Sequence, residues 1–202
     1  MKIFGTKRSK SPSSEMYASS ADFCRVFEDH MDRLYLLSLL LTADPELARK
    51  CFVRGLEDSK NGSPVFKEWA ESWARRTVIT NAIRTIGPRP GNPSLITRSA
   101  QADEIEGLPE KLAAIIDLPK FERFVFVMSV LEGYAARDCR FLLNCSNFDV
   151  AQARAQALQQ LAQSTEAAGS AEALAKTYFE ESRHDADSGL RQERFAHLAA
   201  TA

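Results

Sequence analysis

With 202 residues, the chain is long enough for one substantial hydrophobic core or two small ones, so one or two domains are expected. Its 26 Lys and Arg residues almost balance its 27 Asp and Glu residues, which excludes a charge-driven attraction of the whole molecule to nucleic acid or anionic membranes. No apolar run approaches the ~20 residues that span a bilayer, so the sequence predicts a soluble protein with no membrane partner.

Residues 1–21 carry several Lys and Arg side chains near their start but no apolar segment of the kind that secretion signals need. This composition predicts a flexible basic arm. The cysteines form no CxxC pair, which favours free buried thiols over a zinc site. Free thiols fit a reducing cytoplasm, and no cofactor is expected.

In residues 22–86, apolar side chains recur at helical spacings, which predicts a bundle of amphipathic helices. Asp22 is the expected N-cap of the first helix, and Pro45 stands in the first turn of the second, where its missing N–H donor costs nothing. The motif Asn61-Gly62-Ser63-Pro64 ends that second helix. The expected helices cover residues 23–41, the segment between Asp44 and Asn61, and about 65–86.

Two segments lack a sustained apolar period. Residues 87–107 are rich in proline and glycine, which is typical of an interdomain linker. Residues 164–202 are rich in Ala, Ser and Glu, and we expect a helical tail there, with one helix near 170–182 and no chemistry of its own.

Between these segments, residues 108–163 predict a second helical domain. An apolar stripe from Phe121 to Leu131 forms its first helix, which Gly133 ends. A short helix over 135–143 follows, and Asn144-Cys145 makes a turn. Ser146 and Asp149 then have the spacing of an N-terminal capping arrangement. The packed face of the last helix is expected to hold Val150, Ala153, Ala157 and Leu161.

Two helices joined by a turn of about three residues, the second apolar on one face only, match the helix-turn-helix unit that places its second helix in the major groove of DNA. Short helical hairpins also occur in proteins that never bind DNA, so the pattern alone leaves both interpretations open. The expected fold is all-α, with two small helical domains joined by a flexible linker and a helix-turn-helix in the second.

An ordered set of landmarks makes the pattern more specific. The set comprises Leu118-Pro119, Arg123, Glu132-Gly133, Asp138, Leu143, Ser146, Val150, Ala157 and Leu161. In this order they resemble the C-terminal promoter-binding domain of sigma-70 family RNA polymerase sigma factors of the extracytoplasmic-function type. In the first domain, Phe66, Trp69, Trp73 and Ala74 resemble the same family's region 2 signature, and the likeness covers roughly residues 22–162.

This resemblance implies a subunit that is not an enzyme. Such a protein docks on core RNA polymerase, captures a flipped base of the melted promoter with its first domain, reads the upstream element with its second, and takes an anti-sigma factor as a further partner. Stacking on an aromatic side chain contributes ~1–3 kcal/mol per base. The DNA-binding candidates are Trp73, Arg75, Arg76, Arg84, Arg137, Arg140, Asn147, Phe148, Gln152 and Gln156. The alternative for the tryptophans is a place in the core, which we favour for Trp69.

The chain departs from the family in two segments. The expected polymerase-docking set is Arg49, Lys50, Val53 and Arg54, where the family has an acidic pattern, and the reversed charge opposes docking on the usual surface. On the last helix, Ala151, Ala153 and Gln156 stand where the family usually places Lys or Arg, which forfeits counterion release from DNA. Arg154 replaces an apolar residue near the packed face.

These departures keep a second hypothesis open, a sigma-like protein that binds a regulator without initiating transcription. An enzyme is disfavoured, because the sequence has no Gly-rich phosphate loop, no HExxH motif and no nucleophile elbow.

Overall fold

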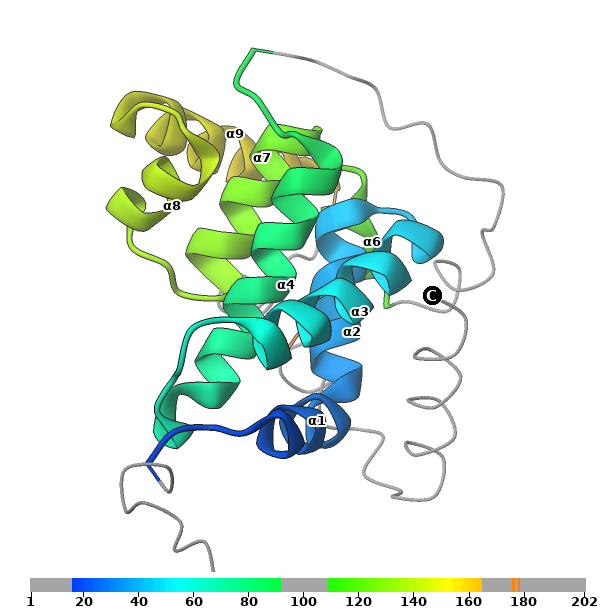
Figure 1. Cartoon of the computed structure of the whole chain (residues 1–202). Helices are drawn as coiled ribbons and strands as arrows, with labels where there is room; N and C mark the ends of the chain where they lie inside the picture. The colour runs from blue at the N-terminus through cyan, green and yellow to red at the C-terminus, as the bar shows by residue number, and fades with distance from the viewer. Residues whose placement is uncertain (1–15, 92–108, 165–175, 177, 179–202) are drawn as a thin grey trace, which may run out of the picture.

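The structure is a computed structural model that describes residues 16–91, 109–164, 176 and 178 (Figure 1). Its elements are α1 (Ser20–Asp29), α2 (Met31–Thr42), α3 (Pro45–Asn61), η2 (Lys67–Trp69), α4 (Ala70–Ile86), α6 (Glu110–Ile116), α7 (Lys120–Phe126), η3 (Val127–Leu131), α8 (Ala136–Leu143) and α9 (Asn147–Ser164). The described residues form helices and no strand, which confirms the all-α prediction. None of these helices is long and apolar enough to cross a membrane.

The first predicted helix is two helices in the structure. The chain leaves helical geometry at His30, so α1 and α2 are separate elements. The N-cap of α1 is Ser19, not Asp22, because Asp22 occupies the third helical position of a reciprocal capping box. The Asp22 N–H donates to Ser19 Oγ at 3.2 Å, and the Ser19 N–H donates to the Asp22 carboxylate at 2.9 Å.

The N-terminal arm is shorter than predicted. Residues 16–18 run antiparallel to residues 65–67, with the Ala18 N–H donating to the Val65 carbonyl at 2.7 Å and the Lys67 N–H donating to the Met16 carbonyl at 3.0 Å. Backbone pairing therefore holds the last part of the predicted arm. Residues 1–15, most of the predicted linker and nearly all of the predicted tail lie outside the described residues.

Helix starts and ends follow the sequence signals more closely in the rest of the chain. Asp44 caps α3 by accepting the Leu47 N–H at 2.9 Å, and Gly87 ends α4 in the left-handed conformation with φ of 60°. The predicted third helix begins with the short 3₁₀ turn η2 and continues as α4.

The turn between α8 and α9 agrees with its prediction. Asn144 adopts the left-handed conformation, with φ of 49°, and Ser146 exchanges hydrogen bonds with Asp149. The four predicted packing residues of α9, Val150, Ala153, Ala157 and Leu161, are all buried. A two-helix hairpin with a short turn is therefore present.

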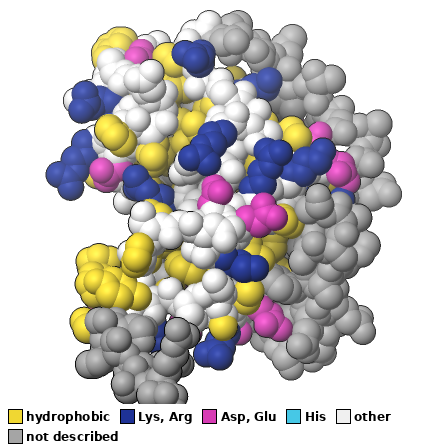
Figure 2. Space-filling model, in the orientation of Figure 1, with side chains coloured by type: hydrophobic (Ala, Val, Ile, Leu, Met, Phe, Trp, Pro, Cys, Tyr) yellow, Lys and Arg dark blue, Asp and Glu magenta, His cyan; other side chains and the backbone are white. Residues whose placement is uncertain are grey.

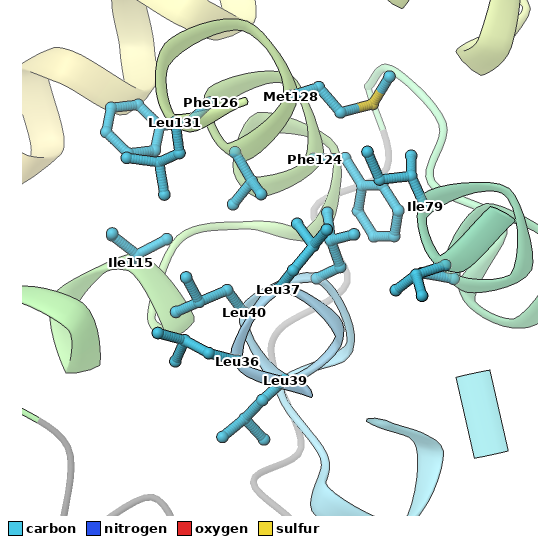
Figure 3. Close-up of a cluster of buried hydrophobic side chains, with 14 of the residues drawn as sticks. Leu36, Leu37, Leu39, Leu40, Ile79, Ile115, Phe124, Phe126, Met128 and Leu131 are labelled. Carbon is cyan, nitrogen blue, oxygen red and sulfur yellow. The ribbon is translucent and has the colours of Figure 1, made fainter. Parts of the chain in front are cut away.

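The separation into two domains is not confirmed. Buried side chains from α1 to α4 and from α6 to α9 form one continuous apolar cluster. In Figure 3, leucines of α2 lie among Ile79 of α4, Ile115 of α6 and Phe124 of α7. Every residue from Leu36 to Leu41 is buried, including Ser38, whose hydroxyl donates to the Ala48 carbonyl of α3 at 2.8 Å. A helix segment that is buried all round has to be covered on all sides. Neither half alone provides that cover, so the two halves share α2 as the centre of one core.

A buried arginine links the two halves. Arg123 on α7 is 1% exposed, and its guanidinium donates to the carbonyls of Leu41 at 3.3 Å, Ile116 at 2.9 Å and Leu118 at 3.3 Å. Burial lowers the pKa of Arg123 to about 10, which leaves it charged at neutral pH. Its cation thus satisfies the last carbonyls of α2 and α6, where the helix dipoles favour positive charge.

Replacing Arg123 by Ala should lower the free energy of unfolding by about 3 kcal/mol or more, because three buried carbonyls lose their donor and a cavity opens. Urea denaturation followed by circular dichroism measures the change. The control is Arg137→Ala, whose side chain is 85% exposed and should have little effect. Equal midpoints for the two variants would refute a structural role for Arg123.

Candidate nucleic-acid interface

An aromatic corner forms where the N-terminal segment meets the start of α4. The rings of Tyr17 and Phe66 stack with centroids 4.8 Å apart, and Phe66 meets Trp69 edge to face at 5.2 Å. Trp69 is 56% exposed, so the interpretation of this residue as part of the core is wrong. Figure 2 shows hydrophobic side chains gathered at the lower left, over the corner where η2 meets α4 in Figure 1.

One face of α4 continues this surface. Trp69, Trp73 and Arg76 follow each other at spacings of four and three, which places them one above the other on a helix. Trp73 is half-buried, and its indole Nε1 is buried with no hydrogen-bond partner among the described residues. An unsatisfied buried donor is unfavourable and marks a place where an acceptor would stabilise the site.

A residue from the other half of the chain lines the same cavity. Tyr134, in the connection between η3 and α8, joins these residues around a cavity of about 500 Å³, which we call the aromatic cleft. The cleft is lined by Ser63, Pro64, Val65, Phe66, Trp69, Ser72, Trp73, Arg76 and Tyr134. Burial and the nearby Glu132 raise the pKa of Tyr134, so its phenol keeps its proton at neutral pH. The cleft therefore offers flat aromatic faces, a neutral hydroxyl and one cation.

A second cavity, of about 420 Å³, shares Trp73 and Arg76 with the aromatic cleft and extends along α4 to Arg84. Arg84 is 66% exposed at its side chain and pairs with Asp58 at 3.2 Å. The structure thus brings three of the predicted DNA-binding residues, Trp73, Arg76 and Arg84, to one continuous surface.

Arg75 lies apart from that surface. Its guanidinium pairs with Glu71 at 2.9 Å and with Glu132 at 3.5 Å, and Glu132 is only 2% exposed at its side chain. The charge of Arg75 is therefore already compensated by carboxylates, so a role in phosphate binding is not supported. The sequence did not single out Glu132 as a partner, because it is 57 positions away in the chain.

The predicted DNA-binding residues of the helix hairpin are all at the surface. Arg137, Arg140 and Asn147 are exposed, and Phe148 is 73% exposed. Arg154 is also exposed, which corrects its predicted place near the packed face, because Ala153 takes the buried position. The hairpin thus carries Arg154 as an exposed cation in addition to Arg137 and Arg140.

Two carboxylates lie near the predicted DNA-binding glutamines of α9. Gln152 and Gln156 line a groove of about 450 Å³ together with Glu122 and Asp149. Capping hydrogen bonds from Ser146 hold the pKa of Asp149 below its ordinary value, so this carboxylate is ionised at neutral pH. Negative charge beside these glutamines opposes the approach of DNA phosphates.

The predicted polymerase-docking residues differ in how far they are exposed. Lys50 and Arg54 are exposed on α3, and Arg49 pairs with Glu46 on the same helix. Val53 is a correction to the set, because it is 9% exposed and packs in the apolar core. The exposed members of the set, Lys50 and Arg54, are both basic.

No protein-family model, curated protein or solved structure was found to match the chain. Within the described residues, no group of His, Cys, Asp or Glu side chains could hold a metal ion.

The two tryptophans offer a direct check of the cleft geometry. With Trp73 replaced by Phe, the remaining Trp69 should be quenched strongly by acrylamide, because more than half of its surface meets solvent. With Trp69 replaced by Phe, the remaining Trp73 should be quenched several-fold less. When both variants are unfolded in urea, acrylamide should quench the remaining tryptophan of each one equally. Equal quenching in the folded variants would contradict the described burial of Trp73.

Proposed function

We propose that the protein is a sigma-70-like transcription subunit of the extracytoplasmic-function type. In this proposal it binds core RNA polymerase in the cytoplasm and takes a base of single-stranded promoter DNA into the aromatic cleft. It makes and breaks no covalent bond, so it is not an enzyme. The observation that carries the proposal is the cleft itself, which combines stacking faces with a cation.

The chemistry of the cleft suits single-stranded nucleic acid. Stacking on Trp69 or Trp73 is open to any base, because each base has a flat face. Arg76 can neutralise a phosphate next to that base, and the described residues that line the cleft include no carboxylate to repel it.

The hairpin supports a second, weaker contact with DNA. Arg137, Arg140 and Arg154 are exposed on α8 and α9, and they could hold the phosphate backbone. The acidic groove beside Gln152 and Gln156 limits base reading to the remaining exposed face of α9. We therefore place the main DNA contact at the cleft.

A second candidate function is a sigma-like protein that binds a regulator and does not initiate transcription. The continuous core favours it, because the two halves are joined as one body and are not free to span two separated promoter elements. Promoter-dependent transcription with core polymerase decides between the two. A stable complex with a regulator but no transcript would favour this candidate.

Trp69→Ala should weaken binding of short single-stranded DNA by about 1–3 kcal/mol, the contribution of one stacked base. Arg76→Ala should weaken binding and reduce the slope of log affinity against log salt by roughly 0.7, the value for one lost phosphate contact. Fluorescence anisotropy with labelled DNA measures both effects.

The matched control for Arg76 is Lys120→Ala at the start of α7, which does not line the cleft and should bind like the wild type. Because Trp69 is more than half exposed and contacts Phe66 at its edge, its variant should lower the unfolding midpoint only slightly. Unchanged affinity and salt slope in both cleft variants would remove single-strand capture from the proposal.

The basic docking surface gives a separate test with core polymerase. The double variant Lys50→Glu/Arg54→Glu should weaken co-purification at least about tenfold, because exposed cations at a docking surface select an acidic partner. Lys120→Glu serves as the charge control. Tighter binding of the double variant would mean that the chain docks on the surface used by acidic sigma factors.

A further inference from the structure

One residue of the C-terminal part of the chain is buried at the junction of the two halves. Tyr178 has no exposed surface and belongs to the same apolar cluster as α2 and α7. Its hydroxyl donates to Glu132 Oε1 at 2.7 Å. Burial and the Glu132 carboxylate raise the pKa of Tyr178 well above its ordinary value, so the hydroxyl keeps the proton that it donates.

Two arginines of the first half of the chain also lie near the Glu132 carboxylate. Arg75 of α4 lies 3.5 Å from one carboxylate oxygen, and Arg33 of α2 lies 3.9 Å from the other. A carboxylate that is 2% exposed is unfavourable unless cations and hydrogen-bond donors compensate it. Three distant segments of the chain therefore converge on one buried side chain.

The same carboxylate sits next to the wall of the aromatic cleft. Glu132 follows η3, and its N–H donates to the Val127 carbonyl at 2.9 Å. Two residues later the Tyr134 N–H donates to the Met128 carbonyl at 2.9 Å. Between them Gly133 has φ of +69°, a conformation that favours glycine. Glu132 and Tyr134 are thus held two residues apart against the same end of η3, so a shift of one would pass to the other through the backbone.

We propose that Tyr178 is a positioning residue for the aromatic cleft, which acts by fixing Glu132 and, through it, the Tyr134 wall. The assignment of single-stranded DNA as the ligand rests on the proposed function, whereas the link from Tyr178 to Tyr134 does not. With Tyr134 in place the cleft has a volume of about 500 Å³, within the ~300–1,000 Å³ of ligand sites. The fixed state therefore has room for a ligand, and loss of Tyr178 should weaken binding by removing preorganisation.

Hydrogen exchange tests the link without any ligand. Tyr178→Phe keeps the buried ring and removes only the hydroxyl. In this variant the amides of Glu132 and Tyr134 should exchange about tenfold faster, the effect of one lost hydrogen bond to a charged group. Amides of α3 serve as the internal reference and should not change. Lys60→Gln, an exposed position of α3 that does not line the aromatic cleft, is the control. Unchanged exchange at Glu132 and Tyr134 would overturn the inference.

Binding of labelled single-stranded DNA gives the second readout. Tyr178→Phe should lower affinity several-fold in the wild type but add nothing in a Tyr134→Ala background, because the effect runs through Tyr134. Additive losses would show a general loss of structure and overturn the inference. If the wild type binds no single-stranded DNA while exchange still responds to Tyr178→Phe, the proposed function fails and the positioning role stands.

Discussion

The burial of one arginine among helix ends determines how this chain can fold. The last carbonyls of α2 and α6 have no partner within their own helices, and Arg123 supplies donors to both. Its charge also lies where both helix dipoles are negative, which offsets part of the desolvation of the guanidinium. Because the three acceptors come from both halves of the chain, the arginine can be satisfied only when the halves are packed together.

Burial of the apolar side chains of α2 also requires the two halves to be packed together. An amphipathic helix can lie on the surface of a small bundle, but α2 has no exposed face over the run from Leu36 to Leu41, in which Ser38 is the one polar residue and is also buried. Helices α3 and α4 cover part of it, and α6 and α7 cover the rest. Removing either half would expose leucines to water. The hydrogen bonds of the Arg123 guanidinium and the burial of α2 thus favour the same compact arrangement.

Local signals in the sequence predicted local structure well. The turn at Asn144, the Ser146 capping arrangement and the buried positions of α9 depend on residues within a few positions of each other. The cleft was predicted only in part, because Trp73 and Arg76 share one helix while Tyr134 joins them from 58 positions beyond Arg76. Leu41, one of the three acceptors of Arg123, is 82 positions away, and Tyr178, a donor to Glu132, is 46 positions away. Nothing in a single sequence tells a buried ion from an exposed one, although both residues are among the landmarks of the sigma-factor resemblance.

The cleft lies at the seam between the two halves, and this has a consequence for mechanism. Its stacking residues Trp69 and Trp73 belong to η2 and α4, and Tyr134 from the connection before α8 completes its lining, so the complete cleft requires both halves to stay together. An arrangement with widely separated halves would remove Tyr134 from this cleft and leave Trp69, Trp73 and Arg76 together on the first half. Base capture against Tyr134 therefore requires the compact arrangement. In that arrangement the hairpin of α8 and α9 is packed on the same core as the residues that line the cleft.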